Sequence, residues 1–301
     1  MAGEKLFDEK TLRKLEQLML VANQVRAGVI KGERRSTRRG TSIEFADYRD
    51  YTKGDDLRRV DWNIFARLER PFIKLLEEEE DLAVHLLVDA SASMDWPRGS
   101  DAPRHVHKFT FARRLLAGLA YISLTSGDRL AVSTLTDRGA QQWGPARGRA
   151  RVLDLLRTLE EFQSGGVTDL NEALSAYALR GGRPGLCIII SDMFSPGGYR
   201  DGLTALQARG YEVALIHILS PDEVNPPLTG DLRLVDVETA VGQDVTVDAA
   251  MRDLYQRRLL GWRDDIGRYC RGRGVHYVAV ETTIPWEEVI LYQLRGLGVV
   301  R

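Results

Sequence analysis

From residue 82 onward, short apolar segments alternate with segments of helical periodicity, and this alternation limits the fold more than any other feature of the chain. The apolar segments cover 82–88, 128–135, 186–190, 211–219 and 275–280. The helical segments cover 109–124, 149–162, 169–179, 199–209, 248–271 and 285–294. Near-continuously apolar strands separated by helices are typical of a mostly parallel sheet covered on both faces. We therefore predict a doubly wound α/β domain over 82–301, with a polar hairpin over 232–247.

Residues 1–81 follow a different pattern and are predicted to form a smaller lobe. Leu12, Leu15, Met19 and Ala22 recur at helical spacing, which predicts an N-terminal helix over about 8–26. A basic loop and a β-containing segment that ends with a strand before residue 82 complete this lobe.

The charge and composition of the chain exclude several classes of protein. Its 301 residues include 42 Lys and Arg against 43 Asp and Glu, a net charge of -1 at pH 7. Nucleic-acid-binding domains are usually distinctly basic, so the bulk charge argues against one. No apolar run reaches the roughly 18 residues that a membrane-spanning helix needs, and the N-terminus lacks a signal-peptide pattern. With only two cysteines, the sequence indicates a cytoplasmic protein without a disulfide framework.

A basic segment over 31–39 is a candidate for an exposed contact, with five cations against one anion. A solvated loop is the plainest interpretation. Alternatively, Arg34, Arg35, Arg38 and Arg39 bind an acidic protein surface or a phosphate-bearing ligand. Nucleic acid is the less expected ligand, because the segment has no aromatic residues for base stacking.

Polar residues gather in three loops that are expected at one edge of the sheet. In open parallel sheets, ligands bind beyond the carboxyl ends of the strands. Alternate side chains of the first loop, 89–93, point the same way if that loop stays extended. The loops offer only oxygen ligands, which suit Mg²⁺, with Mn²⁺ or Ca²⁺ as alternatives. The five predicted metal ligands are Asp89, Ser91, Ser93, Thr168 and Asp192.

Three neighbouring residues have competing interpretations. Met94 and Trp96 border the first loop, where they either form a partner-binding surface or pack in the core. Asp169 precedes a predicted helix and is interpreted as its N-cap rather than as a ligand.

The order Asp89-x-Ser91-x-Ser93, then Thr168, then Asp192 resembles the metal-ion-dependent adhesion site of von Willebrand factor A domains. In that family, the hydroxyls of the first loop, the threonine and the acids hold Mg²⁺ directly or through water, and a partner protein commonly supplies the last ligand. The resemblance implies a von Willebrand factor A-like fold for this chain. It also implies that a carboxylate of a partner protein binds the metal.

A second resemblance lies in the segment over 40–62. Its aromatic and acidic stretch at 44–51, its Gly-Asp-Asp turn at 54–56 and its Asp-Trp pair at 61–62 are similar to the signature of the bacterial family called domain of unknown function 58. Members couple this signature to a von Willebrand factor A-like domain and are often encoded beside MoxR-type AAA+ ATPases. The resemblance implies a non-enzymatic adaptor that assists such an ATPase in protein assembly or remodelling.

The main alternative is a metal-dependent phosphohydrolase with Asp89 as its nucleophile. Haloacid-dehalogenase phosphatases place a second acid two residues after the nucleophile, but Ser91 stands there and cannot donate a proton as an acid at neutral pH. The chain has no Gly-x-x-x-x-Gly-Lys-Ser/Thr loop for ATP hydrolysis. A phosphate or nucleic-acid binder that uses the basic loop is the other alternative. The sequence therefore favours a metal-dependent protein-binding module over an enzyme.

Overall fold

The computed structural model describes residues 13–22, 45–52, 60–76, 82–98, 104–137, 140–180, 182–238 and 240–301. The chain divides into two compact units, a small one over residues 30–81 and a larger one that contains the rest. The small unit ends directly before residue 82. Residues 13–22, however, group with the larger unit instead of with the small lobe, because Leu15, Leu18, Leu20 and Ala22 are buried in its core.

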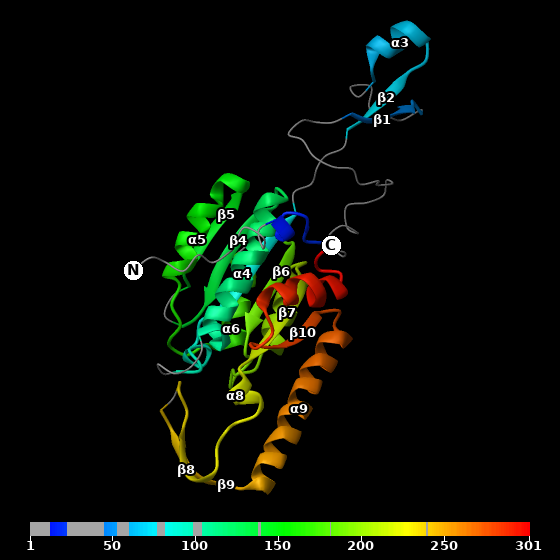
Figure 1. Cartoon of the computed structure of the whole chain (residues 1–301). Helices are drawn as coiled ribbons and strands as arrows, with labels where there is room; N and C mark the ends of the chain where they lie inside the picture. Colours follow the sequence, from blue (N-terminus) through cyan, green and yellow to red (C-terminus); the bar gives the residue numbers. More distant parts are fainter. Residues whose placement is uncertain are drawn as a thin grey trace. The chain divides into compact units, whose positions relative to one another are not determined.

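Within the described residues, a six-stranded sheet forms the centre of the larger unit (Figure 1). Its strands lie in the order β10–β7–β6–β3–β4–β5, and neighbours are parallel except for β4 and β5. They are β3 (Ala83–Asp89), β4 (Arg129–Leu135), β5 (Gln142–Arg147), β6 (Leu186–Ser191), β7 (Glu212–Leu219) and β10 (His276–Glu281). The predicted α/β class with a mostly parallel sheet is confirmed.

Helices cover both faces of this sheet, as predicted. On one face, α4 (Lys108–Thr125) packs together with α5 (Val152–Glu161). The other face is covered by α6 (Leu170–Leu179), α7 (Arg200–Ala208) and α9 (Ala249–Gly272). None of the helices in the described ranges is long and apolar enough to span a membrane.

The side chains of β3 alternate between two cores, because successive residues of a strand point to opposite faces. Val84, Leu86 and Val88 are fully buried beneath α4, whereas Leu87 is buried beneath α6 and α7. Burial of both faces explains why the strand is apolar along most of its length. Asp89 therefore stands out as an acid at the end of a strand that lies wholly within the core.

The strand order reverses between β3 and β6. From β3 the chain passes through α4 to β4 on one side, whereas β6 pairs with β3 on the other side. In open α/β sheets, this switch point at the carboxyl ends of the strands is where ligands bind. The loops after β3 and β6 are two of those in which metal ligands were predicted.

A hairpin follows β7 and a short helix, α8 (Pro221–Val224). It consists of β8 (Gly230–Val235) and β9 (Gly242–Val247), which pair antiparallel, so that its tip lies between Val235 and Gly242. It confirms the hairpin predicted over 232–247 and leads directly into α9 (Figure 1).

The predicted N-terminal helix is wrong over most of its described length. Only the first three described residues, 13–15, are helical, and Leu20 instead pairs antiparallel with Val300. Met19 exchanges backbone hydrogen bonds with Arg301 at 2.9 Å in both directions. The C-terminal segment therefore offers the backbone of residues 19–21 partners that compete with helix formation, a tertiary contact that helical spacing cannot reveal.

Two further elements differ from the sequence prediction. The edge strand β5 was missed, because Pro145 and its polar neighbours are typical of a loop as well as of a sheet edge. The final helix starts as α10 (Trp286–Glu288) and continues over Val289–Leu294 as a wider π-helical turn.

The small unit contains a two-stranded antiparallel sheet of β1 (Phe45–Asp50) and β2 (Phe72–Leu76). Between them lies α3 (Trp62–Leu68), whose N-cap is Asp61. The Asp61 carboxylate accepts the backbone N–H of Asn63 at 2.9 Å, the usual role of an acid at a helix start.

Candidate metal site

The predicted ligand loops meet at the switch point of the sheet. Asp89 is the last residue of β3, and Ser191 is the last residue of β6, directly before Asp192. All three side chains are buried, with exposures of 2% or less. The Ser191 hydroxyl donates to Asp89 Oδ2 at 2.6 Å, so the carboxyl ends of the two strands are joined by side chains as well as by the sheet.

The first loop turns instead of staying extended. Residues Ala92–Met94 form one 3₁₀ turn, which corrects the expectation of an extended chain. The Ser91 N–H donates to Asp89 Oδ1 at 3.0 Å, and the hydroxyls of Ser91 and Ser93 lie 2.8 Å apart. The two hydroxyls thus lie close together. The 3₁₀ turn brings them together, and not the alternation of side chains along an extended loop.

The second loop is held against the first by its backbone. The Gly165 N–H donates to Ala90 O at 2.7 Å, and the Ala92 N–H donates to Gly166 O at 2.9 Å. Gly166 has a φ of 85°, which favours glycine and lets the loop approach so closely. These bonds hold the loop that bears Thr168 against the loop that bears Ser91.

Thr168 itself is buried and keeps its oxygen available. It is 2% exposed, and its hydroxyl donates to Leu135 O at 3.1 Å. Because the proton is directed at a carbonyl, the lone pairs of the Thr168 oxygen remain free to accept a cation. Asp169 is the N-cap of α6 and accepts the Glu172 N–H at 3.0 Å, as its sequence position predicted.

Asp192 in the third loop is tied to a lysine that the sequence analysis did not consider. Lys108, the first residue of α4, is fully buried, and its ammonium lies 2.6 Å from Asp192 Oδ2. The same ammonium lies 2.5 Å from Glu223 Oε1. Glu223 closes a capping box at α8, where its other oxygen accepts the Ser220 N–H at 2.8 Å. One ammonium is thus shared by two carboxylates.

The pKa shifts record a surplus of negative charge. Burial raises the pKa of Asp89 to about 6, and repulsion by Asp192 adds to this effect. Burial likewise raises the pKa of Glu223. Burial alone would lower the pKa of Lys108, but the two carboxylates beside it raise that pKa above its ordinary value. Asp192 and Glu223 therefore share one ammonium, and Asp89 is repelled by Asp192. Repulsion between carboxylates in a buried site favours the binding of a further positive charge.

The residues present fit a hard divalent cation. Ser91, Ser93 and Thr168 offer neutral oxygens, and Asp89 and Asp192 offer negative charge within the same buried region. No sulfur or imidazole belongs to this set, so the chemistry is that of Mg²⁺ rather than of Zn²⁺. The structure brings all five predicted ligands to one end of the sheet.

The predicted partner-binding residues differ in their exposure. Met94 is fully buried in the core, so its assignment to a contact surface is wrong and core packing is the correct alternative. Trp96 is 38% exposed and remains available at the rim of the loop. The basic-loop arginines, Arg34, Arg35, Arg38 and Arg39, lie outside the described residues.

Two residues of this cluster, Lys108 and Glu223, were missed from the sequence, and a third, Ser191, was seen in the third polar loop but given no role. Ser191 has the clearest signal, since it ends an apolar strand next to Asp192. Glu223 is also recognisable, because Ser220 and Glu223 have the spacing of a capping box directly after a strand. Lys108 has no local signal, since its pairing spans 84 residues to Asp192.

These features define an α/β protein with a polar, charge-unbalanced site at the switch point of its sheet, and comparison with known proteins then gives the family. The family model described as "Protein of unknown function DUF58" matches residues 47–263. Uncharacterised proteins of Mycobacterium bovis and Mycobacterium tuberculosis are each 31% identical over 283 residues, covering 93% of this chain and 87% of theirs. The chain therefore belongs to the DUF58 family, as its signature segment predicted.

Solved structures show more distant likenesses. BatB from Bacteroides thetaiotaomicron, a conserved hypothetical protein, is 16% identical with a TM-score of 0.43, over 72% of this chain and 98% of that one. An aerotolerance-related membrane protein from Bacteroides fragilis is 15% identical with a TM-score of 0.43, over 71% and 99%. At this distance the likenesses assign no function.

Proposed function

We propose that this chain is a non-enzymatic protein-binding module whose contact depends on a divalent cation, preferably Mg²⁺, at the carboxyl ends of β3 and β6. The observation that supports it is that Asp192 and Glu223 share one buried ammonium while the buried Asp89 is repelled by Asp192, beside three hydroxyls at the switch point. Such a set is unbalanced as it stands, and a divalent ion would balance it.

Each residue has a distinct part in this proposal. Ser91, Ser93 and Thr168 hold the ion through their hydroxyl oxygens, while Asp89 and Asp192 supply the charge that retains it. The hydrogen bonds of Ser91 N–H and Ser191 Oγ to Asp89 fix the orientation of that carboxylate. The bound ion would act as a Lewis acid that accepts one more oxygen ligand from outside.

The partner in this proposal is another protein that offers an Asp or Glu side chain to the ion. The strand order, with its reversal between β3 and β6, supports the von Willebrand factor A-like fold in which such contacts occur. A MoxR-type AAA+ ATPase is the proposed co-worker, on the basis of the family resemblance. Cys187 and Cys270 are buried and form no disulfide, which fits the reducing cytoplasm that we propose as the location of this chain.

The buried position of Asp89 supports this reading over phosphate-ester hydrolysis. Asp89 is 2% exposed, and each of its oxygens already accepts a hydrogen bond. A nucleophile must reach the substrate's phosphorus, which a carboxylate fixed in this way does not. The residue two positions later is Ser91, whose hydroxyl contacts Ser93 and is no acid.

Binding of the metal alone tests the proposal. We expect Mg²⁺ and Mn²⁺ to bind the chelator-treated protein in a calorimetric titration and to raise its Tm. Ser91→Ala removes one hydroxyl whose side-chain partner is Ser93, so the variant should fold and bind Mn²⁺ at least about tenfold more weakly. Ser175→Ala, on α6, serves as the matched control and should bind like the wild type. Absence of any metal effect on the wild type would refute the proposed function.

A further inference from the structure

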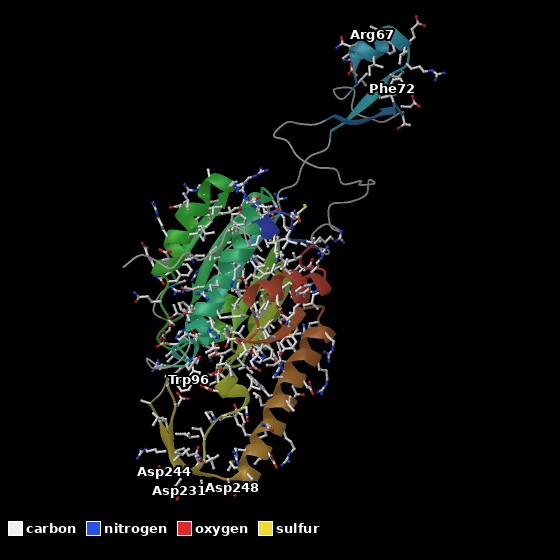
Figure 2. The ribbon with its side chains drawn as sticks, in the orientation of Figure 1. Arg67, Phe72, Trp96, Asp231, Asp244 and Asp248 are labelled. Carbon is white, nitrogen blue, oxygen red and sulfur yellow. The ribbon has the colours of Figure 1, made fainter. Side chains whose placement is uncertain are left out.

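A hollow of about 290 Å³ lies beside the sheet, at the end of the strands away from the candidate metal site. Ala83 and Arg129 line it, and they are the first residues of β3 and β4, so the hollow lies toward the amino ends of these strands. The candidate metal ligands lie at the carboxyl ends, where Figure 2 labels Trp96, which follows the first ligand loop. The hollow is therefore separate from the site described above.

The hollow exists because the face of the sheet beneath it carries small side chains. Leu87 and Leu135 fill the space under α6 at the carboxyl ends of β3 and β4. Toward the amino ends, the residues of the two strands that point to the same face are Ala83, Ala131 and Ser133. Side chains this small leave a gap between the strands and the carboxyl end of α6, which contributes the opposite wall.

Part of that wall is a fixed, neutral pair of rings. His85 Nε2 lies 3.1 Å from Arg183 O, and because a carbonyl oxygen only accepts, Nε2 carries the hydrogen. Burial lowers the pKa of His85, so the ring is neutral and its Nδ1 accepts the Tyr177 hydroxyl, 2.7 Å away. The pair brings no charge to the hollow, but it holds the backbone of Arg183 beside it.

Three arginines line the hollow, and among the described residues no acid does. Arg129 belongs to β4, Arg180 is the C-cap of α6, and Arg183 lies in the loop before β6. All three are exposed, and within the described part of the chain none of them forms an ion pair. The helix dipole accounts for a cation at Arg180 but not for the other two. The chain has 42 cations against 43 anions, so this excess of positive charge is local.

The lining combines these cations with apolar surface. Ala83 and Ala131 are joined by Pro145, which lies with Gly144 in a bulge of β5 where the register against β4 shifts. Pockets for small ligands are mostly apolar with a few polar groups, and they begin at about 300 Å³. Guanidinium groups bind carboxylates and phosphates through paired N–H donors. The lining therefore suits a compact molecule with one anionic group and an apolar body.

We propose that this hollow binds a small organic anion, whose carboxylate or phosphate is held by the three arginines and whose apolar body lies over the small side chains of β3 and β4. The anion cancels the local excess of positive charge, and its apolar body displaces water from the alanines and the proline. The site needs no metal, so the inference goes beyond the proposed function and does not depend on it.

Phenyl phosphate and benzoate are the probes, and the full chain is kept in a buffer with a chelator so that no phosphate binds through a metal. Benzyl alcohol keeps the ring without the charge, and inorganic phosphate keeps the charge without the ring. Ligand-observed NMR and calorimetry measure binding. At least one of the two aromatic anions should bind with a Kd below about 1 mM. Benzyl alcohol and inorganic phosphate should bind at least about tenfold more weakly, and the tighter of the two probes identifies the preferred anionic group.

Two variants and a matched control locate the binding. Ala131→Leu fills the hollow without a change of charge, and Arg180→Gln removes one exposed cation without filling the space. Each should weaken binding of the tighter probe by about tenfold. Arg258→Gln, at an exposed arginine of α9, loses the same charge and should bind like the wild type. The Tm of each variant shows whether it folds, and the exposed position of Arg180 keeps the test decisive if Ala131→Leu does not.

Three results would overturn the proposal. The first is that neither aromatic anion binds the wild type saturably. The second is wild-type affinity in either variant that folds. The third is equal weakening in Arg258→Gln, which would assign the binding to charge in general. None of these results bears on the metal titration, so the proposed function stands or falls separately.

Discussion

Strand β3 carries a buried polar cluster near each of its ends, and the two clusters differ in charge. Near the amino end, His85 Nδ1 lies 2.7 Å from the Tyr177 hydroxyl, and its Nε2 lies 3.1 Å from Arg183 O. Burial lowers the pKa of His85, so the ring is neutral at pH 7. At the carboxyl end, Asp89 lies among further carboxylates that share the single ammonium of Lys108.

The difference concerns how each cluster balances its charge. Neutral groups satisfy one another by exchanging hydrogen bonds, as His85 and Tyr177 do, and the edge-on ring of Tyr211 completes their packing. A surplus of buried charge has no such solution within the protein, since every added hydrogen bond leaves the net charge unchanged. Burial alone therefore does not identify a functional site, whereas unbalanced burial of charge does.

The largest effect is expected from removal of the ammonium. Lys108→Met leaves the buried Asp192 and the mostly buried Glu223 without their shared cation, which should lower the free energy of unfolding by about 3–5 kcal/mol. Urea denaturation of the chelator-treated protein measures the loss. Arg268→Met removes a cation from an exposed pair with Asp265 and should cost at most about 1 kcal/mol. Equal losses of stability in the two variants would mean that the Lys108 ammonium contributes no more than a cation of an exposed ion pair.

Asp89→Asn should raise the free energy of unfolding of the metal-free protein, whereas Lys108→Met should lower it. The pKa of Asp89 rises from 3.8 to about 6 on folding, so the folded state holds the proton more tightly than the unfolded chain does. The charged carboxylate therefore opposes folding above pH 6, and this penalty vanishes as the pH falls toward 3.8. Such a rise corresponds to about 3 kcal/mol at pH 7. Asp89→Asn should be more stable than the wild type by up to that amount.

The pH and metal dependence of this variant distinguish the cause. The advantage of Asp89→Asn over the wild type should shrink between pH 6 and pH 4, where the wild-type carboxyl becomes protonated. Saturating Mg²⁺ at pH 7 should stabilise the wild type and leave Asp89→Asn unchanged. Chemical denaturation at pH 4 and pH 7, with and without Mg²⁺, measures both. A variant less stable than the metal-free wild type at pH 7 would contradict the surplus-charge interpretation.

Within the carboxyl-end cluster, the sequence reveals the candidate metal ligands better than their charged partners. Asp89, Thr168 and Asp192 were recognisable because each follows an apolar strand or precedes a helix, and the parallel sheet brings such positions to one edge. Of the partners that set their charge, Glu223 has a capping-box signal, whereas Lys108 has none. Lys108 reaches Asp192 across 84 residues, a contact that no local periodicity specifies.

The fold shows the same limit. The buried strands and the helices that cover them after residue 82 follow from local periodicity, because each buries a face that the pattern marks, whereas the edge strand β5 does not. The segment over residues 19–21 does not follow it, since its helical spacing is overridden by backbone pairing with the C-terminus. Local patterns thus predicted most elements and the polar residues that gather at the strand ends, whereas contacts between distant segments decided the exceptions.

The smallest effect is expected at the amino end of β3. Tyr177→Phe removes the hydroxyl that His85 contacts, and His85 is only 8% exposed, so one ring nitrogen loses its partner. Loss of one such hydrogen bond should cost about 1–2 kcal/mol in urea denaturation. Tyr292→Phe, at a residue that is 70% exposed, should change stability by less than about 0.5 kcal/mol. Neither substitution should alter the Mg²⁺-induced rise in Tm, because the charge surplus lies at the other end of the strand. A change in that rise for Tyr177→Phe would show that the two clusters are coupled through β3, and the separation between a structural cluster and a metal-binding cluster would no longer hold.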